Sequence, residues 1–424
     1  MAKPKLALIP ATQGSKLYSV LPADGVGDFT FSRNTGATRI NKDGLIETVA
    51  VGKSRLNYPL IDGVVNGCPS HLLEPERLQL IQYSEDFSNA AWVKTNIAIT
   101  SNNTISPDGA LNGTKLNENT VSSTNFRLRG SSVVTTGANT LSIFAKASER
   151  NWIKLRENAQ TGVYAFFDLK NGIVGQTNAD DAIIEYYGNG WYKLSITDVL
   201  TSAAIDVRIA ISNGVDTYNG VIGNGVYVWG AQLEQGSYAT SYIPNYGTSA
   251  GITRVAETAN GAGDASTFNS LEGVLMAEIS ALADDADTLR WINLSDGGTS
   301  NRVAFYYRTD ENQLTYLVSS GGTQVFSTVT LSSASSFNKI AAKYKQNDFS
   351  LWINGYELIT DTNGNAPVGL NDLSFDNAVG GDNFYGSAKQ LQYFDSALND
   401  SDLETITSWT SFTDLANGQT YSIK

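Results

Sequence analysis

The sequence predicts an all-β protein made of antiparallel β-sandwiches in tandem. Its 424 residues suffice for two or three domains, each able to bury its own core. The chain holds 39 glycines against 9 prolines, with 20 tyrosines and 16 phenylalanines, which suits many short strands joined by tight turns. Charged residues make up only 17% of the chain, fewer than helical proteins usually place on their exposed faces. These counts favour strands over helices.

The range 76–245 carries the strongest strand signal and is expected to form the first sandwich. Apolar and polar residues alternate over 205–212 and over 152–156, which is the period of a half-buried strand. Asn-Gly pairs at 171–172 and 189–190 predict hairpin turns, the first of them of type I′. Because turn signals recur about every ten residues, the pattern is that of a sandwich and not of alternating strands and helices.

Two other stretches lack a steady period. Residues 1–75 hold short β-like pieces between Gly and Asp turns, and we expect an extended arm or small β-region that packs on something else. Residues 246–270 are rich in Gly, Ala, Ser and Thr, a composition typical of a linker between domains.

The range 271–408 predicts a second sandwich. Val303, Phe305 and Tyr307 are spaced two residues apart and are expected to form one inward row of a strand. The strand expected at 349–353 runs into Asn354-Gly355, a further hairpin signal. No heptad run or solenoid repeat interrupts this pattern.

One short helix is expected at the end of the second sandwich. In 399–406, Asn399 can cap the helix start and acidic residues follow in the first turn, where the helix dipole favours them. Residues 409–424 are expected to form a C-terminal extension.

The charge balance narrows the range of partners. The net charge is −13, so nucleic acid and anionic lipid should both be repelled, and no basic run or aromatic-basic strip in the sequence offsets this. The N-terminal stretch MAKPKLALIPA has too short an apolar run for the hydrophobic region of a secretory signal. No segment approaches the ~18 consecutive apolar residues that are needed to span a bilayer. We therefore expect no nucleic-acid partner, no membrane insertion and synthesis in a cytoplasm.

The scarcity of Cys and His limits the disulfides and the catalytic groups that the chain can form. Cys68 is the single cysteine and His71 the single histidine, so a disulfide framework is excluded and any catalytic triad would need His71, which we expect to be structural. Glycoside hydrolases need two carboxylates at a fixed separation, and those built on sandwiches usually carry them on one strand as Glu-x-Asp. No such strand is found in this sequence, since Glu278 is followed by Ile-Ser-Ala-Leu. We expect a protein that is not an enzyme; the enzymatic alternative is a depolymerase with carboxylates on separate strands.

The chain contains ATRINKDGLIETVA with LNYPLIDGVVNGCPSHLLEPERLQLIQYSEDFSNAAWVK, and later VYVWGAQLEQGSYATSYIP. These two passages resemble structural proteins of tailed bacteriophages. In those phage proteins a small arm leads into a jelly roll like that of carbohydrate-binding modules, and the second passage resembles its closing strand. The resemblance covers residues 37–245. It implies that the arm anchors the chain on a virion and that 76–245 is a jelly roll.

A third stretch consists of KIAAKYKQNDFSLWINGYEL and FYGSAKQLQYFDSALNDSDLETI. It resembles the laminin-G and pentraxin group of concanavalin-A-like sandwiches. This resemblance implies the fold of 271–408 but leaves function open, because the group contains lectins, adhesins, spacers and enzymes.

Together the resemblances imply a phage virion protein of the fibre, spike or decoration type, on tail or head. Its lectin-like domains would attach to host-surface glycans, and its other partners would be virion proteins. Repeated copies would strengthen weak binding, and fibres of this kind are commonly trimers. The alternative is a purely structural decoration or connector protein that binds neighbouring virion subunits.

Aromatic side chains are the first candidates for a glycan site, because flat rings pack on the C–H faces of sugars. Trp352 is of most interest, since it alternates outward from Phe349, Leu351 and Ile353 and is expected to face solvent or a partner. The candidates are Trp92, Trp152, Trp291, Trp352, Tyr187 and Tyr306.

We expect no cofactor; the alternative is calcium, which carboxylate and amide oxygens on loops can bind. Two loops of the second sandwich carry clusters of such residues, although Asp and Asn are also ordinary turn residues. The candidate ligands are Asp284, Asp285 and Asp287 in one loop, and Asp376, Asp382 and Asn383 in the other.

Overall fold

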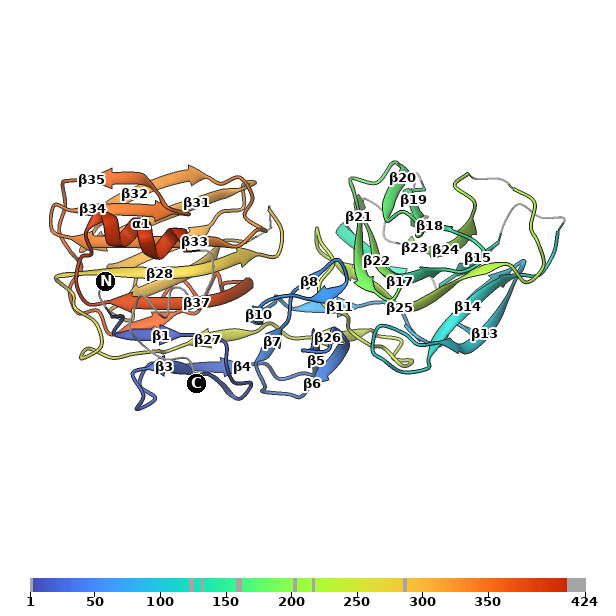
Figure 1. Cartoon of the computed structure of the whole chain (residues 1–424), viewed down its shortest axis with the longest axis horizontal. Helices are drawn as coiled ribbons and strands as arrows, with labels where there is room; N and C mark the ends of the chain where they lie inside the picture. Colours follow the sequence, from blue (N-terminus) through green and yellow to red (C-terminus); the bar gives the residue numbers. More distant parts are fainter. Residues whose placement is uncertain are drawn as a thin grey trace.

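The molecule is elongated, with two β-sandwiches joined by a group of short strands (Figure 1). The computed structural model describes residues 3–121, 126–130, 133–157, 162–200, 204–215, 218–284 and 288–409. Strands dominate the described residues, which confirms the predicted all-β class with antiparallel sandwiches.

The first sandwich consists of two six-stranded antiparallel sheets. In order across the sheet, one contains β12 (Val93–Thr95), β15 (Arg127–Arg129), β24 (Val207–Ser212), β18 (Trp152–Glu157), β19 (Tyr164–Asp168) and β20 (Ile173–Thr177). The other contains β13 (Ile97–Thr104), β14 (Gly113–Glu118), β25 (Gly225–Gln235), β17 (Gly137–Ala147), β22 (Trp191–Leu200) and β21 (Asp181–Gly188). Inward residues of both sheets, such as Leu141 and Ile209, form one apolar core.

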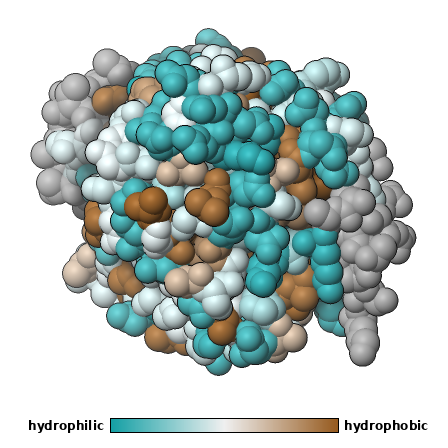
Figure 2. Space-filling model, turned by 90° about the vertical axis from the view of Figure 1, so that its left-hand side faces the viewer, coloured by the Kyte–Doolittle hydropathy of each residue, from teal (hydrophilic) through white to brown (hydrophobic). Residues whose placement is uncertain are grey.

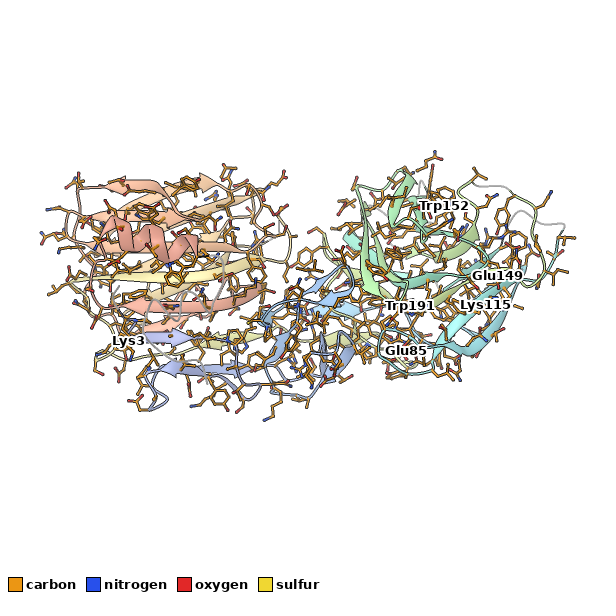
Figure 3. All side chains as sticks on the ribbon, viewed as in Figure 1. Lys3, Glu85, Lys115, Glu149, Trp152 and Trp191 are labelled. Carbon is orange, nitrogen blue, oxygen red and sulfur yellow. The ribbon has the colours of Figure 1, made fainter. Side chains whose placement is uncertain are left out.

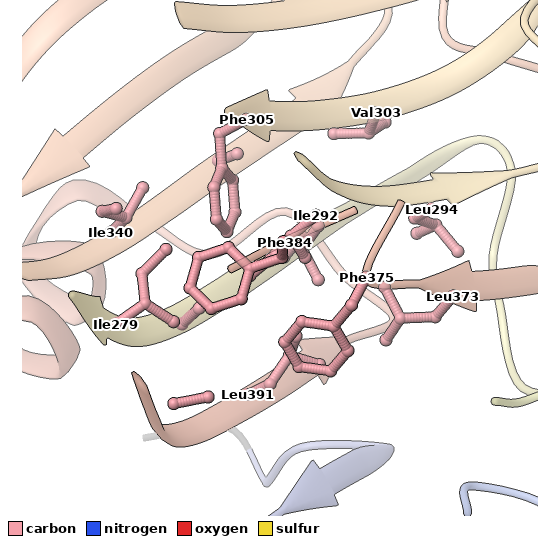
Figure 4. Packing of buried hydrophobic residues seen from close by; sticks show 14 of the residues in the cluster. Ile279, Ile292, Leu294, Val303, Phe305, Ile340, Leu373, Phe375, Phe384 and Leu391 are labelled. Atoms are coloured by element: carbon pink, nitrogen blue, oxygen red, sulfur yellow. The ribbon is translucent and has the colours of Figure 1, made fainter. Parts of the chain in front are cut away.

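The second sandwich packs a nine-stranded sheet on a five-stranded one. The larger contains β3 (Ser19–Leu21), β1 (Leu6–Leu8), β37 (Gly386–Phe394), β28 (Glu272–Ala281), β33 (Asn338–Lys345), β34 (Phe349–Ile353) and β35 (Tyr356–Asp361), with β10 (Ser70–Leu73) and β7 (Arg55–Asn57) joined at β37. The smaller contains β32 (Thr323–Thr330), β31 (Gln313–Ser320), β30 (Asn301–Tyr307), β29 (Arg290–Ser295) and β36 (Asp372–Ser374). Figure 4 shows side chains of this core, with Phe305, Phe375 and Phe384 among them.

The chain begins in the second sandwich, runs out to the first and returns. β1 pairs with β37 and β3, so N-terminal residues complete a sheet made mostly of C-terminal strands (Figure 1). Short sheets carry the chain between the sandwiches: β2 (Lys16–Leu17), β4 (Phe29–Ser32) and β27 (Thr258–Asn260); β5 (Ala37–Ile40) and β6 (Ile46–Val49); β8 (Leu60–Ile61) and β9 (Val64–Val65); and β11 (Arg77–Gln79) and β26 (Ile252–Arg254). A further short pair, β16 (Val133–Val134) and β23 (Ala204–Ile205), belongs to the first sandwich.

The stretches without a steady period are paired in the structure. The outgoing strand β11 pairs with the returning strand β26, and β4 pairs with β27. Glu257, between the two returning strands, is fully buried. The outgoing residues 29–79 and the returning residues 252–260 therefore form one connecting region that is held together by strand pairing.

Paired strands flank all three Asn-Gly pairs, so the predicted hairpins are confirmed. Asn189-Gly190 and Asn354-Gly355 both have positive φ at both positions and join paired strands. The type I′ turn expected at Asn171-Gly172 is wrong, because Asp168 pairs with Ile173 and four residues lie between them. The Asp168 carboxylate accepts from the backbone N–H of Lys170 at 2.9 Å, which stabilises the wider loop.

The helix predicted near the end of the second sandwich is confirmed as α1 (Asp400–Ser408), with Asn399 as its N-cap. The side chain of Asn399 accepts from the backbone N–H of Asp402. Leu403 and Ile406 pack on the outer face of the nine-stranded sheet. No helix within the described residues has the length and apolarity required to span a membrane.

The end of the second sandwich carries hydrophilic, intermediate and hydrophobic residues side by side (Figure 2). Hydrophobic residues there stand singly or in small groups among hydrophilic ones (Figure 2). Scattered apolar residues are normal on soluble domains and do not by themselves mark a binding site.

Candidate functional site

Cations gather on the outer face of one sheet of the first sandwich. The strands that carry them are neighbours in the order β15-β24-β18-β19. Alternate residues of each strand point into the core, so the residues between them point outward. In β18, Ile153 and Leu155 lie in the core, and Lys154 and Arg156 lie on the outer face, as the alternation predicts.

The strand register places three arginines side by side on this face. Arg129 lies opposite Arg208, Arg208 lies opposite Arg156, and Tyr164 follows in the same row. The Nη2 of Arg208 donates to Asp206 Oδ2 at 3.0 Å, and the Nη1 of Arg129 lies 3.7 Å from the same oxygen. Because two guanidinium groups share one carboxylate, the row keeps a net positive charge.

The adjacent row adds further cations and a ring. Arg127 lies opposite Ala210, Ala210 opposite Lys154, and Lys154 opposite Phe166. The Lys154 ammonium lies 4.1 Å from the centroid of the Tyr164 ring and 4.6 Å from that of Phe166. These cation–π contacts hold the ammonium at the surface of the sheet between two aromatic side chains.

Arg208 and Arg156 of the first row and the whole of the second row line a cleft of ≈ 270 Å³. Phe126 and Val215 complete its wall from the loops at one end of the sandwich. We call this site the basic cleft; it is lined by Phe126, Arg127, Lys154, Arg156, Phe166, Arg208, Ala210, Ile211, Ser212 and Val215.

The electrostatics of the basic cleft favour an anion. The Nε atoms of Arg127 and Arg156 are buried without a hydrogen-bond partner within the described part of the chain. Burial lowers the pKa of the Arg127 guanidinium, and the positive charges of Arg208 and Arg129 lower it further. A bound anion would supply acceptors and offset this repulsion. The sequence holds no basic run because the cations of this face come from strands that are far apart in the chain.

Trp152 extends the same face by a third row. It lies opposite Ser212 on one side and Asp168 on the other, and it is half-buried (Figure 3). Its indole packs beside Gly214, where a Cβ would lie 3.2 Å from the ring. Trp152 is the one predicted glycan-binding tryptophan that stands on the face of the basic cleft.

The other predicted tryptophans are buried. Trp92 is 1% exposed, and its indole N–H donates to the carbonyl of Tyr83 at 3.0 Å. The expectation that Trp352 faces solvent is wrong: it does point outward from the sandwich core, but α1 covers it and leaves 7% exposed. Trp291 and Tyr306 are stacked, with centroids 3.8 Å apart, and both are buried.

Tyr187 occupies a different place from the basic cleft. It lies on β21 in the opposite sheet and contacts Phe144 edge-on, with centroids 5.0 Å apart. It is partly buried and lines a second, smaller pocket between the first sandwich and the connecting strands. The structure therefore separates the predicted aromatic residues instead of gathering them.

The carboxylates of the predicted calcium ligands that the structure describes accept hydrogen bonds from neighbouring loop residues. The Asp284 carboxylate accepts from Ser333 and Ser335, and the Asp376 carboxylate accepts from the backbone N–H of Ala378. Asp382 Oδ2 accepts from the Asn377 amide at 3.0 Å, and Asn383 is partly buried nearby. Asp285 and Asp287 lie outside the described residues. No three His, Cys, Asp or Glu residues of the described part cluster as a metal site, and calcium stays a prediction.

Glu157 is a titratable residue that the sequence analysis missed. It ends β18 on the inward side, is 1% exposed, and has no hydrogen-bond partner for either carboxylate oxygen within the described ranges. Burial raises its pKa to about 8, with a further contribution from the Asp198 carboxylate. The signal was present, because the period of two that places Ile153 and Leu155 inward also places Glu157 inward.

Comparison with known proteins finds similarity at the level of structure only. No protein-family model matches the sequence, and no curated protein is similar to it. The chain is similar to a carbohydrate-binding module of the Ruminococcus gnavus IT-sialidase, at 15% identity and a TM-score of 0.29 over 35% of this chain and 87% of that one. It is also similar to Trypanosoma rangeli sialidase, at 10% identity and a TM-score of 0.30 over 70% of this chain and 60% of that one.

A third similarity is to NanB sialidase from Streptococcus pneumoniae, at 16% identity and a TM-score of 0.29, covering 33% of this chain and 24% of that one. At such identities and TM-scores the likeness does not assign an activity. It does correct one expectation. Sialidases are among the solved structures similar to this chain, so the expectation that the chain is not an enzyme was wrongly drawn from missing motifs.

Proposed function

We propose that the first sandwich binds acidic glycans, sugars that carry carboxylate or sulfate groups, in the basic cleft. The observation that carries the proposal is the row of Arg129, Arg208 and Arg156 on neighbouring strands, in a protein whose net charge is −13. A guanidinium group pairs with a carboxylate or sulfate through two parallel hydrogen bonds, so a row of them fits a chain of spaced anions.

The aromatic side chains beside the cations suit a sugar in particular. Tyr164 continues the arginine row, Phe166 the second row, and Trp152 the third. A sugar ring presents a flat apolar C–H surface together with its polar groups, so a face with both aromatic and cationic residues matches it on both counts. Free phosphate or a simple anion would use only the cations.

A finer proposal concerns the biological setting. The passages within 37–245 that resemble tailed-phage structural proteins support a role on a virion, where the cleft would attach the particle to acidic glycans of the host surface. Several copies on one particle would turn weak single-site binding into firm attachment. Antibodies raised against the chain should label purified particles and block adsorption to host cells; unlabelled particles would contradict this setting.

Calorimetric titration with sialyllactose and with lactose tests the ligand class, since the two differ by one acidic sugar. We expect sialyllactose to bind and lactose to bind at least about tenfold more weakly, a difference of ~1.4 kcal/mol. Affinity should fall as salt rises, because the contacts are between charges. Equal affinities for the two sugars, or tighter binding of a single-stranded DNA oligonucleotide than of any acidic glycan, would overturn the proposal.

Two variants localise the binding. Arg156→Gln should weaken sialyllactose binding about tenfold, the scale expected when a charge-assisted pair to a bound anion is lost. Arg308→Gln is the matched control, because Arg308 is a partly exposed arginine of the second sandwich that pairs with Asp310 at 3.1 Å. Equal losses in both variants would show that overall charge and not the basic cleft governs binding.

A further inference from the structure

A second pocket lies where the connecting strands meet the first sandwich. It has a volume of ≈ 170 Å³. One wall comes from the outer face of β17, β22 and β21, and the other comes from β5, β6, β7 and β10. We call it the junction pocket; the residues that matter for its chemistry are Arg39, Asn57, Phe144, Glu185, Tyr187 and Lys193.

An acid and a base lie side by side on one wall of this pocket without forming an ion pair. Glu185 of β21 lies directly opposite Lys193 of β22 in the strand register. The Lys193 ammonium donates to the carbonyl of Thr240 at 2.9 Å, and it forms no ion pair within 4.0 Å with any described carboxylate. Lys193 is only 7% exposed, so its remaining N–H groups are held toward the pocket instead of bulk water. A hydroxyl group between the two residues would accept from Lys193 and donate to Glu185.

The rest of the lining supplies a ring surface. Tyr187 lies two residues after Glu185 on the same face, and its ring is fixed edge-on against Phe144, with an interplanar angle of 80°. Burial raises the pKa of the Tyr187 hydroxyl, and the Glu185 carboxylate raises it further, so the hydroxyl stays protonated and able to donate. The Nε atom of Arg39 is buried with no partner within the described residues.

The charges of the junction pocket are largely balanced within the protein. Glu74 is held by Arg55 at 2.7 Å and by Arg254 at 2.9 Å, and Arg39 lies 3.4 Å from Glu47. The pocket therefore lacks the excess of cations found in the basic cleft. Its volume is also well below the about 300–1,000 Å³ typical of sites for drug-sized ligands.

We infer that the junction pocket binds one neutral pyranose residue, with its C–H face on Tyr187 and its hydroxyl groups between Glu185 and Lys193. Paired donors and acceptors around a small cavity match the hydroxyl pairs of a sugar ring, whereas an acidic sugar would meet the Glu185 carboxylate. The site is separate from the basic cleft, because it lies on the other sheet of the first sandwich.

Saturation-transfer NMR on the full chain tests this inference, with methyl β-galactoside, methyl α-glucoside and N-acetylglucosamine as probes. At least one should give signal from its ring C–H protons, and Glu185→Ala should weaken that binding about tenfold. Glu185 is exposed, so this variant keeps the fold. Arg156→Gln in the basic cleft should leave neutral-sugar binding unchanged.

Absence of signal from all three probes at millimolar concentration would overturn the inference, as would binding that survives Glu185→Ala and Tyr187→Ala together. Loss of neutral-sugar binding in Arg156→Gln would place it in the basic cleft and would overturn the inference as well. The two sites fail independently, since failure of sialyllactose binding leaves these NMR outcomes intact.

Discussion

Gly63 and Gly188 lie in backbone contact where the connecting region docks on the first sandwich. Gly63 is in the turn between β8 and β9, and Gly188 ends β21; both have positive φ. A Cβ on Gly63 would overlap the backbone nitrogen and Cα of Gly188, and a Cβ on Gly188 would overlap the carbonyl oxygen of Gly63. Only glycine allows this approach, so the contact fixes where the β8–β9 hairpin sits beside the junction pocket.

Gly63→Ala should therefore displace the hairpin. The variant carries both the strain of a positive φ and the overlap with Gly188, so we expect it to lower the free energy of unfolding by about 2–3 kcal/mol. Amide hydrogen exchange should accelerate in Leu60–Val65 and in the turn after β21, while the core of the second sandwich stays protected.

Gly52→Ala is the matched control. Gly52 also has a positive φ of 70°, but a Cβ there would meet no atom within 4 Å. It should cost only about 1 kcal/mol, the share due to backbone strain. If Gly63→Ala and Gly52→Ala cost the same amount, the contact with Gly188 does not hold the hairpin.

Glu257 is the centre of a buried network of charges in the connecting region. Its carboxylate lies 2.6 Å from Nη1 of Arg33 and 2.9 Å from Nε of Arg55, and it accepts from the backbone N–H of Glu74. Glu257→Gln leaves the buried Arg33 guanidinium without its counter-charge and removes one of the two carboxylates paired with Arg55, so it should lower the free energy of unfolding by about 3–5 kcal/mol. Urea unfolding measures the change.

Glu272→Gln serves as the control for Glu257→Gln. Glu272 pairs with Lys345 at 2.8 Å, but both side chains are solvent-accessible, at 29% and 50%. A pair in this setting contributes about 0–1 kcal/mol. A loss at Glu257 as small as that at Glu272 would show that the buried network does not stabilise the connecting region.

The basic cleft shows which part of the site follows from sequence alone. Alternation in β18 correctly predicts that Lys154 and Arg156 point outward. It does not predict that Arg156 stands beside Arg208, because the strand order β15-β24-β18 joins segments more than fifty residues apart. Strand order depends on how the whole sheet closes its core, and no local pattern records it.

For Trp352, the sequence predicts the direction of the side chain but not its burial. Its outward direction in β34 is predictable from the alternation of Phe349 and Leu351, and the structure agrees. Its burial depends on α1, whose Leu403 and Ile406 pack on the same face. The short helix itself is predictable from its Asn cap, but the face that it covers is a tertiary property.

Glu157 should make the stability of the first sandwich depend on pH. Its folded-state pKa is raised to about 8, above the ordinary carboxylate value, so the protonated form is favoured in the fold. The favourable contribution of Glu157 to the free energy of unfolding is fully present below its unfolded-state pKa and is lost as the pH rises through its folded-state pKa. Glu157→Gln should therefore leave stability at pH 4.5 nearly unchanged and raise it at pH 8 by about 1–3 kcal/mol.

Thermal unfolding at several pH values checks the Glu157 prediction. Glu185→Gln is the control, because Glu185 is an exposed carboxylate of the same sandwich. A gain from Glu157→Gln that is the same at pH 4.5 and pH 8 would contradict a protonated Glu157 in the fold.

His71 should remain neutral across the physiological range. It is 1% exposed on β10, between β7 and β37, and neither ring nitrogen has a hydrogen-bond partner within the described residues. Burial lowers its pKa to about 3. Since His71 is the only histidine of the chain, its imidazole gives one NMR signal, which we expect not to titrate between pH 5 and pH 8.

The lowered pKa of His71 also sets a direction for stability. An unfolded histidine takes up a proton near pH 6.5, whereas the folded one does not, so stability is present above that pH and falls as pH drops toward 3. His71→Leu should remove this loss. The variant should therefore raise the free energy of unfolding by about 2 kcal/mol more at pH 5 than at pH 8. An imidazole signal that titrates near pH 6.5 in the folded protein would mean that His71 is solvated, and the excess at pH 5 would then vanish.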